Sequence, residues 1–121
     1  MKKGRKVSGG RYIQSRKKKL YERKGQARIV KLEATKVKKI RTHGNKQKTV
    51  LLQADVANVF SKKTGKTKKA KIKNVLETIS NRFLARQNIL VKSAVIETEL
   101  GKARITNRPS QEGFVQAELL E

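Results

Sequence analysis

Few side chains in this sequence could carry out acid–base or nucleophilic chemistry. The chain has a single histidine, His43, and no cysteine, which excludes cysteine nucleophiles and thiolate metal sites. His43 stands beside Gly44 in a basic stretch without an acidic partner, so a turn residue or a contact to a phosphate or nucleotide base is favoured over a general base. We therefore predict that the protein is not an enzyme.

Two other small groups of residues could in principle bind a metal ion or a nucleotide. Glu97 and Glu99 are two residues apart, which places both carboxylates on one face of a strand. A solvated strand edge, or ion pairs with Arg104 across a hairpin, is favoured for them over a metal or acid–base pair. Gly9 and Gly10 have neither a preceding strand nor the Lys-Ser or Lys-Thr ending of a phosphate-binding loop. No metal site, cofactor or small-molecule substrate is predicted.

Positive charge is the dominant property of the chain. Its 121 residues include 32 Lys and Arg but only 9 Asp and Glu, and a net charge of +23 makes a compact state repel itself unless anions lie nearby. Residues 1–48 hold 19 cations against two acids (+17), residues 49–92 hold 10 against two (+8), and residues 93–121 hold three against five (−2). We expect the N-terminal half and the middle to bind an anionic partner, and the last third to build the fold.

The cations are concentrated in two segments that differ from an ordinary solvated surface, which mixes charges of both signs. The first runs from Arg5 to Lys24 and contains one acid and two tyrosines, which can stack on bases while Arg and Lys contact phosphates. The second is the lysine-rich segment 61–71. Both segments predict nucleic-acid binding. The candidate RNA-binding residues are Lys2, Lys3, Arg5, Lys6, Gly9, Gly10, Arg11, Tyr12, Arg16, Lys17, Lys18, Lys19, Tyr21, Arg23, Lys24, Arg28, Lys38, Lys39, Arg41, Thr42, His43, Gly44, Asn45, Lys46, Lys48, Lys62, Lys63, Lys66, Lys68, Lys69 and Lys71.

Folded RNA is the favoured partner among nucleic acids. The lack of cysteine excludes zinc fingers, and no helix-turn-helix pattern is evident. A basic arm and lysine-rich loops beside a compact domain suit the irregular grooves of a folded RNA better than a regular duplex. A non-sequence-specific, chromatin-like DNA-binding protein remains an alternative, as does a membrane-surface or localisation role for the basic segments.

The chain divides into a basic arm, residues 1–26, and a β domain, residues 27–121. The arm has few apolar residues and four glycines, so it cannot bury enough area to fold alone and is expected to be extended or disordered until it binds. Gly9 and Gly10 would let its backbone turn sharply and approach a phosphate closely. Residues 15–24 could form a short helix with Ser15 as its cap.

The β domain is predicted from short segments rich in Val, Ile and Thr that are separated by turn residues. The arrangement is typical of an all-β fold, a small barrel or sandwich of about six short antiparallel strands. Residues 61–71 are predicted to form a basic turn or loop, and residues 81–88 a helical turn or a loop. The expected strands are 35–42, 48–59, 72–79, 94–100, 103–107 and 114–120, with turns at 43–45, 101–102 and around Gly113.

The compartment is predicted from what the sequence lacks. No apolar run approaches the roughly 20 residues of a membrane span, and no apolar stretch follows the basic N-terminus as in a signal peptide. Together with the absence of cysteine, this predicts a cytoplasmic protein without membrane contact. We expect it to be a monomer when it is not bound to its partner.

Three stretches resemble a known family. Residues 5–12, RKVSGGRY, are similar to the N-terminal signature of the small-subunit ribosomal protein family S8e. Residues 40–48, IRTHGNKQK, resemble the basic Gly-Asn loop of that family, although His43 stands where many members have arginine. Residues 96–121, IETELGKARITNRPSQEGFVQAELLE, resemble its C-terminal hairpin and last strand and are the most specific of the three.

The resemblance implies a β-barrel that binds small-subunit rRNA, with a basic extension threaded into the RNA, neighbouring ribosomal proteins as partners, and no enzymatic activity. The shortness of the chain is similar to the archaeal form of the family. Because the barrel also resembles that of certain ribosome-assembly factors, an assembly role remains an alternative. The positions that match the family motifs are Arg5, Lys6, Gly9, Gly10, Arg11, Arg41, Thr42, Gly44 and Asn45.

Overall fold

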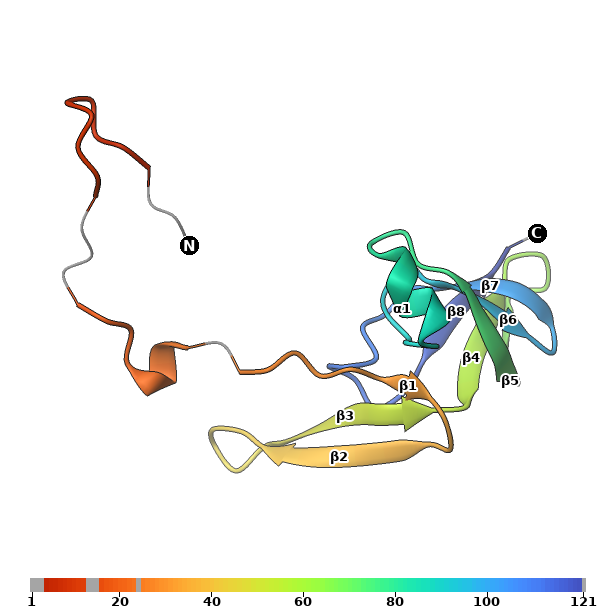
Figure 1. Ribbon diagram of the computed structural model, residues 1–121. Coiled ribbons are helices and arrows are strands. Elements are labelled where there is room, and N and C mark those ends of the chain that lie inside the picture. The colour runs from red at the N-terminus through yellow and green to blue at the C-terminus, as the bar shows by residue number, and fades with distance from the viewer. Residues whose placement is uncertain (1–3, 13–15, 24, 121) are drawn as a thin grey trace.

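The computed structural model describes residues 4–12, 16–23 and 25–120 of the protein (Figure 1). It contains two β-sheets, a short α-helix and an N-terminal segment with one helical turn. The strands are β1 (Lys31–Leu32), β2 (Lys36–Arg41), β3 (Gln47–Ala54), β4 (Val56–Ser61), β5 (Lys66–Glu77), β6 (Val95–Thr98), β7 (Gly101–Ile105) and β8 (Gln116–Leu119). The helices are the 3-10 helix η1 (Leu20–Glu22) and the α-helix α1 (Arg82–Arg86).

Five strands close into a barrel in the order β4-β5-β6-β7-β8. Neighbours along this order are antiparallel, but β8 closes the barrel by pairing in parallel with β4, with Val59 opposite Ala117. The predicted all-β class is therefore confirmed, and the structure decides for a barrel over a sandwich. The expectation that the strands are all antiparallel is wrong, because the last strand, β8, lies beside β4 and runs in the same direction.

The barrel interior combines alanines with branched side chains. Ala57, Ala70, Ala103 and Ala117 are buried on four different strands, and the larger Ile96 is completely buried on β6. A five-stranded barrel leaves little room at its axis, so small residues alternate with a few branched ones. In the expected strand 114–120, Val115 and Ala117 lie two residues apart and are both buried.

The segment 48–59, predicted as one strand, is two strands that belong to different sheets. Asp55 interrupts it: β3 pairs with β1 and β2 in a three-stranded sheet, whereas β4 enters the barrel. The Thr35 hydroxyl donates a hydrogen bond to the Asp55 carboxylate, and the Asp55 carbonyl accepts from the Ile72 amide at 2.8 Å. The side chain and the carbonyl of Asp55 make these bonds outside the strand pairing of both sheets. The chain therefore changes direction at this residue, between β3 and β4.

The lysine-rich segment 61–71 is a hairpin and not a loop. Ser61 pairs with Lys66, so only four residues form the turn, and Gly65 within it adopts φ +62°. Strand β5 begins at Lys66 and continues to Glu77. Lysines can occupy this strand because their side chains point outward, whereas Ala70 and Ile72 point into the barrel.

The C-terminal hairpin forms as predicted, although its turn lies two residues earlier. Thr98 pairs with Gly101, so the turn is residues 99–100 and Gly101, with φ +123°, begins β7. The ambiguous segment 81–88 contains α1, where the Asn81 side chain accepts a hydrogen bond from the Phe83 amide at 2.9 Å. That N-terminal cap satisfies an amide that a short helix cannot pair internally.

A connecting loop, residues 106–115, joins the barrel to the three-stranded sheet. The Leu51 amide of β3 donates to the carbonyl oxygens of Pro109 and Glu112, at 3.3 and 3.0 Å. The half-buried loop is held by Asn107, whose amide nitrogen donates to the Phe114 carbonyl at 2.8 Å and whose amide oxygen accepts from the Gln116 amide at 3.0 Å. Asn107 therefore fixes how the two sheets meet.

Replacing Asn107 with Ala is expected to lower the free energy of unfolding by about 2–3 kcal/mol, because it removes a buried side chain that makes part-buried hydrogen bonds to the Phe114 carbonyl and the Gln116 amide. Urea unfolding followed by circular dichroism measures this change. Thr106→Ala, which alters an exposed neighbour that makes only a 3.4 Å bond, is the control and should change the stability by less than about 1 kcal/mol. Equal stability of the Asn107 variant and the wild type would contradict the role given to this side chain.

Candidate nucleic-acid interface

All of the predicted RNA-binding residues that the structure describes are exposed to solvent. Lys2, Lys3 and Lys24, together with the predicted helix cap Ser15, lie outside the described residues. Exposure alone does not make an interface, so the local geometry and the acidic partners of the cations decide which of them are available to an anion.

The hairpin between β2 and β3 presents one compact group of candidates. Thr42 closes its tip, with its amide and its hydroxyl both donating to the Lys46 carbonyl, at 2.8 and 2.9 Å. Gly44 and Asn45 turn the chain with φ of +69° and +57°, a conformation that glycine and asparagine adopt at low cost. Arg41, Lys46 and Lys48 flank this tip, and the described residues place no carboxylate in an ion pair with them. The predicted turn at 43–45 is confirmed.

The hairpin between β4 and β5 presents the second group, but one of its lysines is already neutralised. Lys62 forms an ion pair with Glu118 of β8 at 2.7 Å. On β5 the side chains of Lys69 and Lys71 alternate outward with the buried Ala70. Lys71 also lowers the pKa of Asp55 from its ordinary value, after the larger effect of the hydrogen bond from Thr35. The free positive charge of this hairpin is therefore smaller than the sequence suggests.

The N-terminal segment carries its candidates on local turns. Gly9 has φ +81°, and the Lys6 amide donates to the Gly10 carbonyl at 2.7 Å, so residues 5–11 form a tight turn closed by a bridge between Arg5 and Arg11. The Lys6 ammonium lies 5.9 Å from the centroid of the Tyr12 ring. Gly9 thus provides the sharp turn expected of it, whereas Gly10 has an ordinary negative φ.

Further along this segment, Arg16 makes a bidentate ion pair with Glu22, at 2.7 and 2.8 Å. Its hydrogen bonds hold the pKa of Glu22 below the ordinary value, and the Lys19 amide adds to this effect. The predicted helix over 15–24 is only the single turn η1 in the described part. Of the four basic residues 16–19, Arg16 therefore already has an anionic partner, which reduces its value for binding a phosphate.

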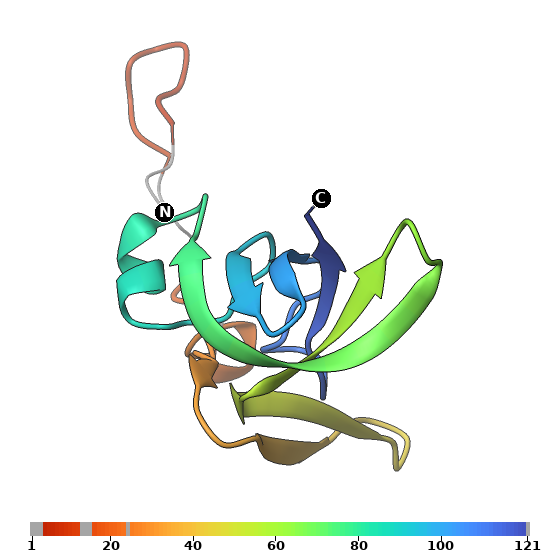
Figure 2. The same cartoon turned by 90° about the vertical axis from the view of Figure 1, so that its right-hand side faces the viewer.

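The structure does not bring the candidates into one patch. The turns of the β2–β3 and β4–β5 hairpins lie at separate corners of the molecule in both views (Figures 1 and 2). Arg28 has a structural contact instead, because its guanidinium donates to the Ser110 carbonyl of the connecting loop at 3.1 Å. An RNA that contacts both hairpins would have to bend around the molecule or present two separate helices.

Among the exposed cations that were not predicted to bind RNA, three lie on β5 and α1. Lys73 continues the outward alternation of Lys69 and Lys71 along β5, and Arg82 and Arg86 lie four residues apart on α1. A period of two in a strand and a spacing of four in a helix each place side chains on one face. Both spacings can be read from the sequence, but they indicate a shared face only when the strand and the helix are known.

The residues considered for catalysis are not assembled into a site. Glu97 lies opposite Lys102, and Arg104 lies opposite Val95 and Glu118. Of the two alternatives for the glutamates, the ion pair with Arg104 is therefore not formed in the described part of the chain, whereas Glu99 is exposed, as the solvated alternative predicts. Glu99 is in the turn and not on the strand face of Glu97. Within the described ranges, no group of three His, Asp or Glu side chains could hold a metal ion. No helix in this part of the chain is long and apolar enough to cross a membrane.

The sequence of the chain matches a known protein family along nearly its whole length. Residues 1–120 match the family described as ribosomal protein S8e. The chain belongs to the ribosomal protein S8e family. The resemblance inferred from the three sequence motifs is therefore confirmed over nearly the whole chain.

Three relatives show the extent of this S8e match, and each is named small ribosomal subunit protein eS8. The proteins of Methanosarcina barkeri and Methanocorpusculum labreanum are each 44% identical over 117 residues, which cover 97% of this chain and 94% of the relative. That of Methanocella arvoryzae is 43% identical over 116 residues, covering 96% and 93%. The S8e chain described here therefore spans nearly the full length of these relatives.

Proposed function

We propose that this S8e protein is a structural constituent of the small ribosomal subunit, in the cytoplasm, which binds and stabilises folded small-subunit rRNA during assembly and in the mature ribosome. The observation that carries the proposal is the match to a ribosomal protein family along nearly the whole chain. The net charge of +23 supports it, because rRNA would supply the anions that such a chain needs.

The roles that we propose for the two parts of the chain follow from the distribution of charge. Residues 1–26 act as a basic arm that enters the rRNA, and residues 27–121 act as a barrel domain that fixes the position of the arm. The β2–β3 tip and the β4–β5 hairpin each contact a separate phosphate backbone. The other partners are neighbouring small-subunit proteins, and no small-molecule substrate or cofactor takes part.

A competition experiment tests this function. Labelled small-subunit rRNA is bound at about 0.2 M salt, where weak phosphate contacts are largely suppressed, and an excess of unlabelled duplex DNA or tRNA is added. We expect the complex to survive the competitor and chemical footprinting to confine the protein to one rRNA region. Displacement by DNA in proportion to its concentration would instead support the chromatin-like alternative and overturn the proposal.

A further inference from the structure

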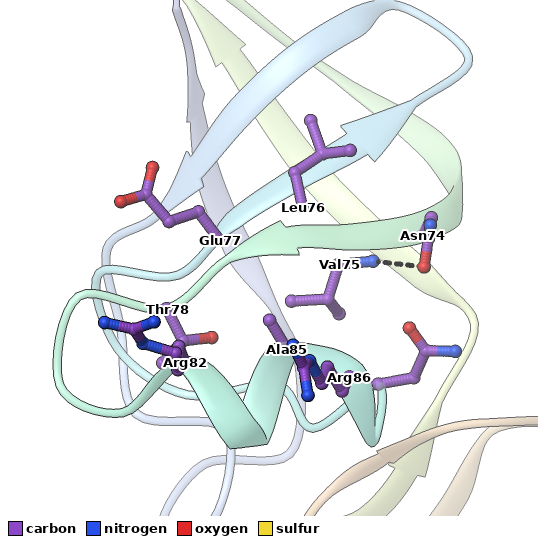
Figure 3. A pocket seen from close by; sticks show the side chains of 9 residues that line it. Asn74, Val75, Leu76, Glu77, Thr78, Arg82, Ala85 and Arg86 are labelled. Carbon is purple, nitrogen blue, oxygen red and sulfur yellow. Dashed lines mark hydrogen bonds between the residues drawn. The ribbon is translucent and has the colours of Figure 1, made fainter.

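A pocket of about 420 Å³ lies between the end of β5 and α1, and none of its lining residues was predicted from the sequence to bind RNA (Figure 3). Its polar lining residues are Asn74, Glu77, Thr78, Arg82, Arg86 and Asn88. The volume is in the range of small-ligand sites, so it can hold a group the size of one nucleotide.

Two guanidinium groups without acidic partners line this pocket. Arg82 and Arg86 lie one helical turn apart on α1, and both are exposed. In the part of the chain that the structure describes, neither forms an ion pair with a carboxylate. Glu77 also lines the pocket, but Figure 3 shows its side chain pointing away from α1, as does that of Leu76. An anion in the pocket would therefore meet two uncompensated positive charges.

The wall formed by β5 adds a buried hydroxyl without a partner. Thr78 is 3% exposed, and among the described residues its Oγ1 atom has no hydrogen-bond partner. Figure 3 shows this hydroxyl directed from the end of β5 toward α1. A buried polar atom that stays unpaired destabilises the fold, and a bound ligand can supply the missing partner.

An aromatic ring beside the pocket and two amides in its lining add further groups. Phe83 follows Arg82 on α1 and is not part of the pocket lining; it is 61% exposed, so its ring offers a surface next to the pocket on which a base can stack, and the Arg86 guanidinium lies 6.0 Å from the ring centroid. The Asn74 amide oxygen accepts from the Val75 backbone amide at 2.9 Å, which leaves the Asn74 amide nitrogen to donate. Asn88 is held by β1, because its carbonyl accepts from the Leu32 amide at 2.9 Å.

A row of lysines leads to the pocket along the same strand. Lys69, Lys71 and Lys73 point outward from β5 at alternate positions, about 6.6 Å apart, and the strand then continues to the pocket wall. A nucleic-acid backbone that follows this row would arrive at α1, where the guanidinium groups are.

We infer that this pocket binds one unpaired nucleotide of the rRNA. Its phosphate lies between Arg82 and Arg86, its base stacks on Phe83, and the edge of the base bonds to the Asn74 amide and the Thr78 hydroxyl. The inference rests on the proposed rRNA binding and adds a specific nucleotide to it. An acidic peptide would use only the guanidinium groups, whereas a nucleotide also uses the amides, the hydroxyl and the exposed ring.

The first test compares two variants that each remove two exposed cations. Arg82→Ala with Arg86→Ala removes those of the pocket, and Lys102→Ala with Arg104→Ala removes two from β7. Binding to small-subunit rRNA at about 0.2 M salt is measured together with nucleotide-resolution chemical probing. We expect the pocket variant to lose about tenfold or more in affinity, and to lose protection of one unpaired nucleotide. The β7 variant should stay within about threefold of the wild type and keep that protection.

The outcomes distinguish a failure of the pocket inference from a failure of the proposed rRNA binding. The pocket inference is overturned if the two variants have the same affinity for rRNA and the same nucleotide protection. The proposed function still stands in that case, provided that the wild type remains selective for rRNA. If the wild type itself has no preference for rRNA over competitor, the proposed function fails and the pocket inference fails with it.

A second test uses the unpartnered hydroxyl and does not depend on charge. Thr78→Val should leave the fold as stable as the wild type or more stable, but weaken protection of the same nucleotide by about threefold or more. Its control is Thr98→Val, which removes a buried hydroxyl that donates to the Gly101 carbonyl at 2.8 Å. That control should lower stability and leave the protection unchanged. Unchanged protection in the Thr78 variant would show that the Thr78 hydroxyl does not bind the nucleotide.

Discussion

Alanine in place of Arg16, Lys17, Lys18 and Lys19 is expected to weaken rRNA binding roughly 30- to 80-fold at about 0.2 M salt and to leave the barrel folded. Because Arg16 is held in a bidentate pair with Glu22, about three of the four cations are free to neutralise phosphates. At about 0.7–0.9 of a counterion released per phosphate, the plot of log affinity against log salt should become flatter by about 2–3 units.

The control for this variant removes the same number of cations from residues 92–108, in and just before the acidic last third of the chain. Lys92, Lys102, Arg104 and Arg108 are exposed, and none was predicted to bind RNA. Their replacement by alanine should change the salt dependence by less than about one unit. Equal losses in the two variants would mean that total charge matters and the arm does not.

The arm variant also tests whether the arm and the barrel are independent. In the described residues, the side-chain contacts of Arg16 are to Glu22, and residues 16–19 are exposed. Thermal unfolding followed by circular dichroism should therefore give the wild-type transition. Global unfolding of the arm variant would contradict the proposed division of the chain at residue 26.

Replacing Ile96 with Ala is expected to lower the free energy of unfolding by about 3–5 kcal/mol, measured by urea unfolding in the absence of RNA. Ile96 is completely buried on β6, opposite Val75 of β5 and Ala103 of β7. Those neighbours belong to a closed ladder, which can shift little to fill the cavity. Small domains have only about 5–15 kcal/mol of stability, so this change would remove a large share of it.

Leu100→Ala is the matched control for the barrel core. Leu100 is an aliphatic side chain in the adjoining turn and is 44% exposed, so its truncation should cost less than about 1 kcal/mol. If the two variants had the same urea midpoint, Ile96 would not be the packing centre that its burial indicates. Saturating rRNA should raise the midpoint of both variants, because a ligand that binds only the folded state stabilises it.

Individual residues of the candidate interface could be predicted from the sequence only where the residue type alone indicates phosphate binding. Lysines, arginines and glycines predict phosphate binding whatever the fold, and the described candidates are exposed. The ion pairs of Lys62 with Glu118 and of Arg16 with Glu22 could not be predicted, because partners that neutralise a cation are chosen by the fold. The pocket at Thr78, Arg82 and Arg86 was missed because it needs a strand end and a helix placed together.

The charge, the all-β class, the C-terminal hairpin and the family could be predicted without the fold, since each follows from composition, alternation or a local motif. Three features required the folded structure: Asp55 divides two sheets, β5 continues through the lysines, and β8 closes the barrel beside β4 in parallel. Alternation shows which side chains share a face, but it does not show which strand lies next to which. That choice depends on contacts between residues about 60 positions apart in the chain, such as Val59 and Ala117, and therefore on the packing of the whole barrel.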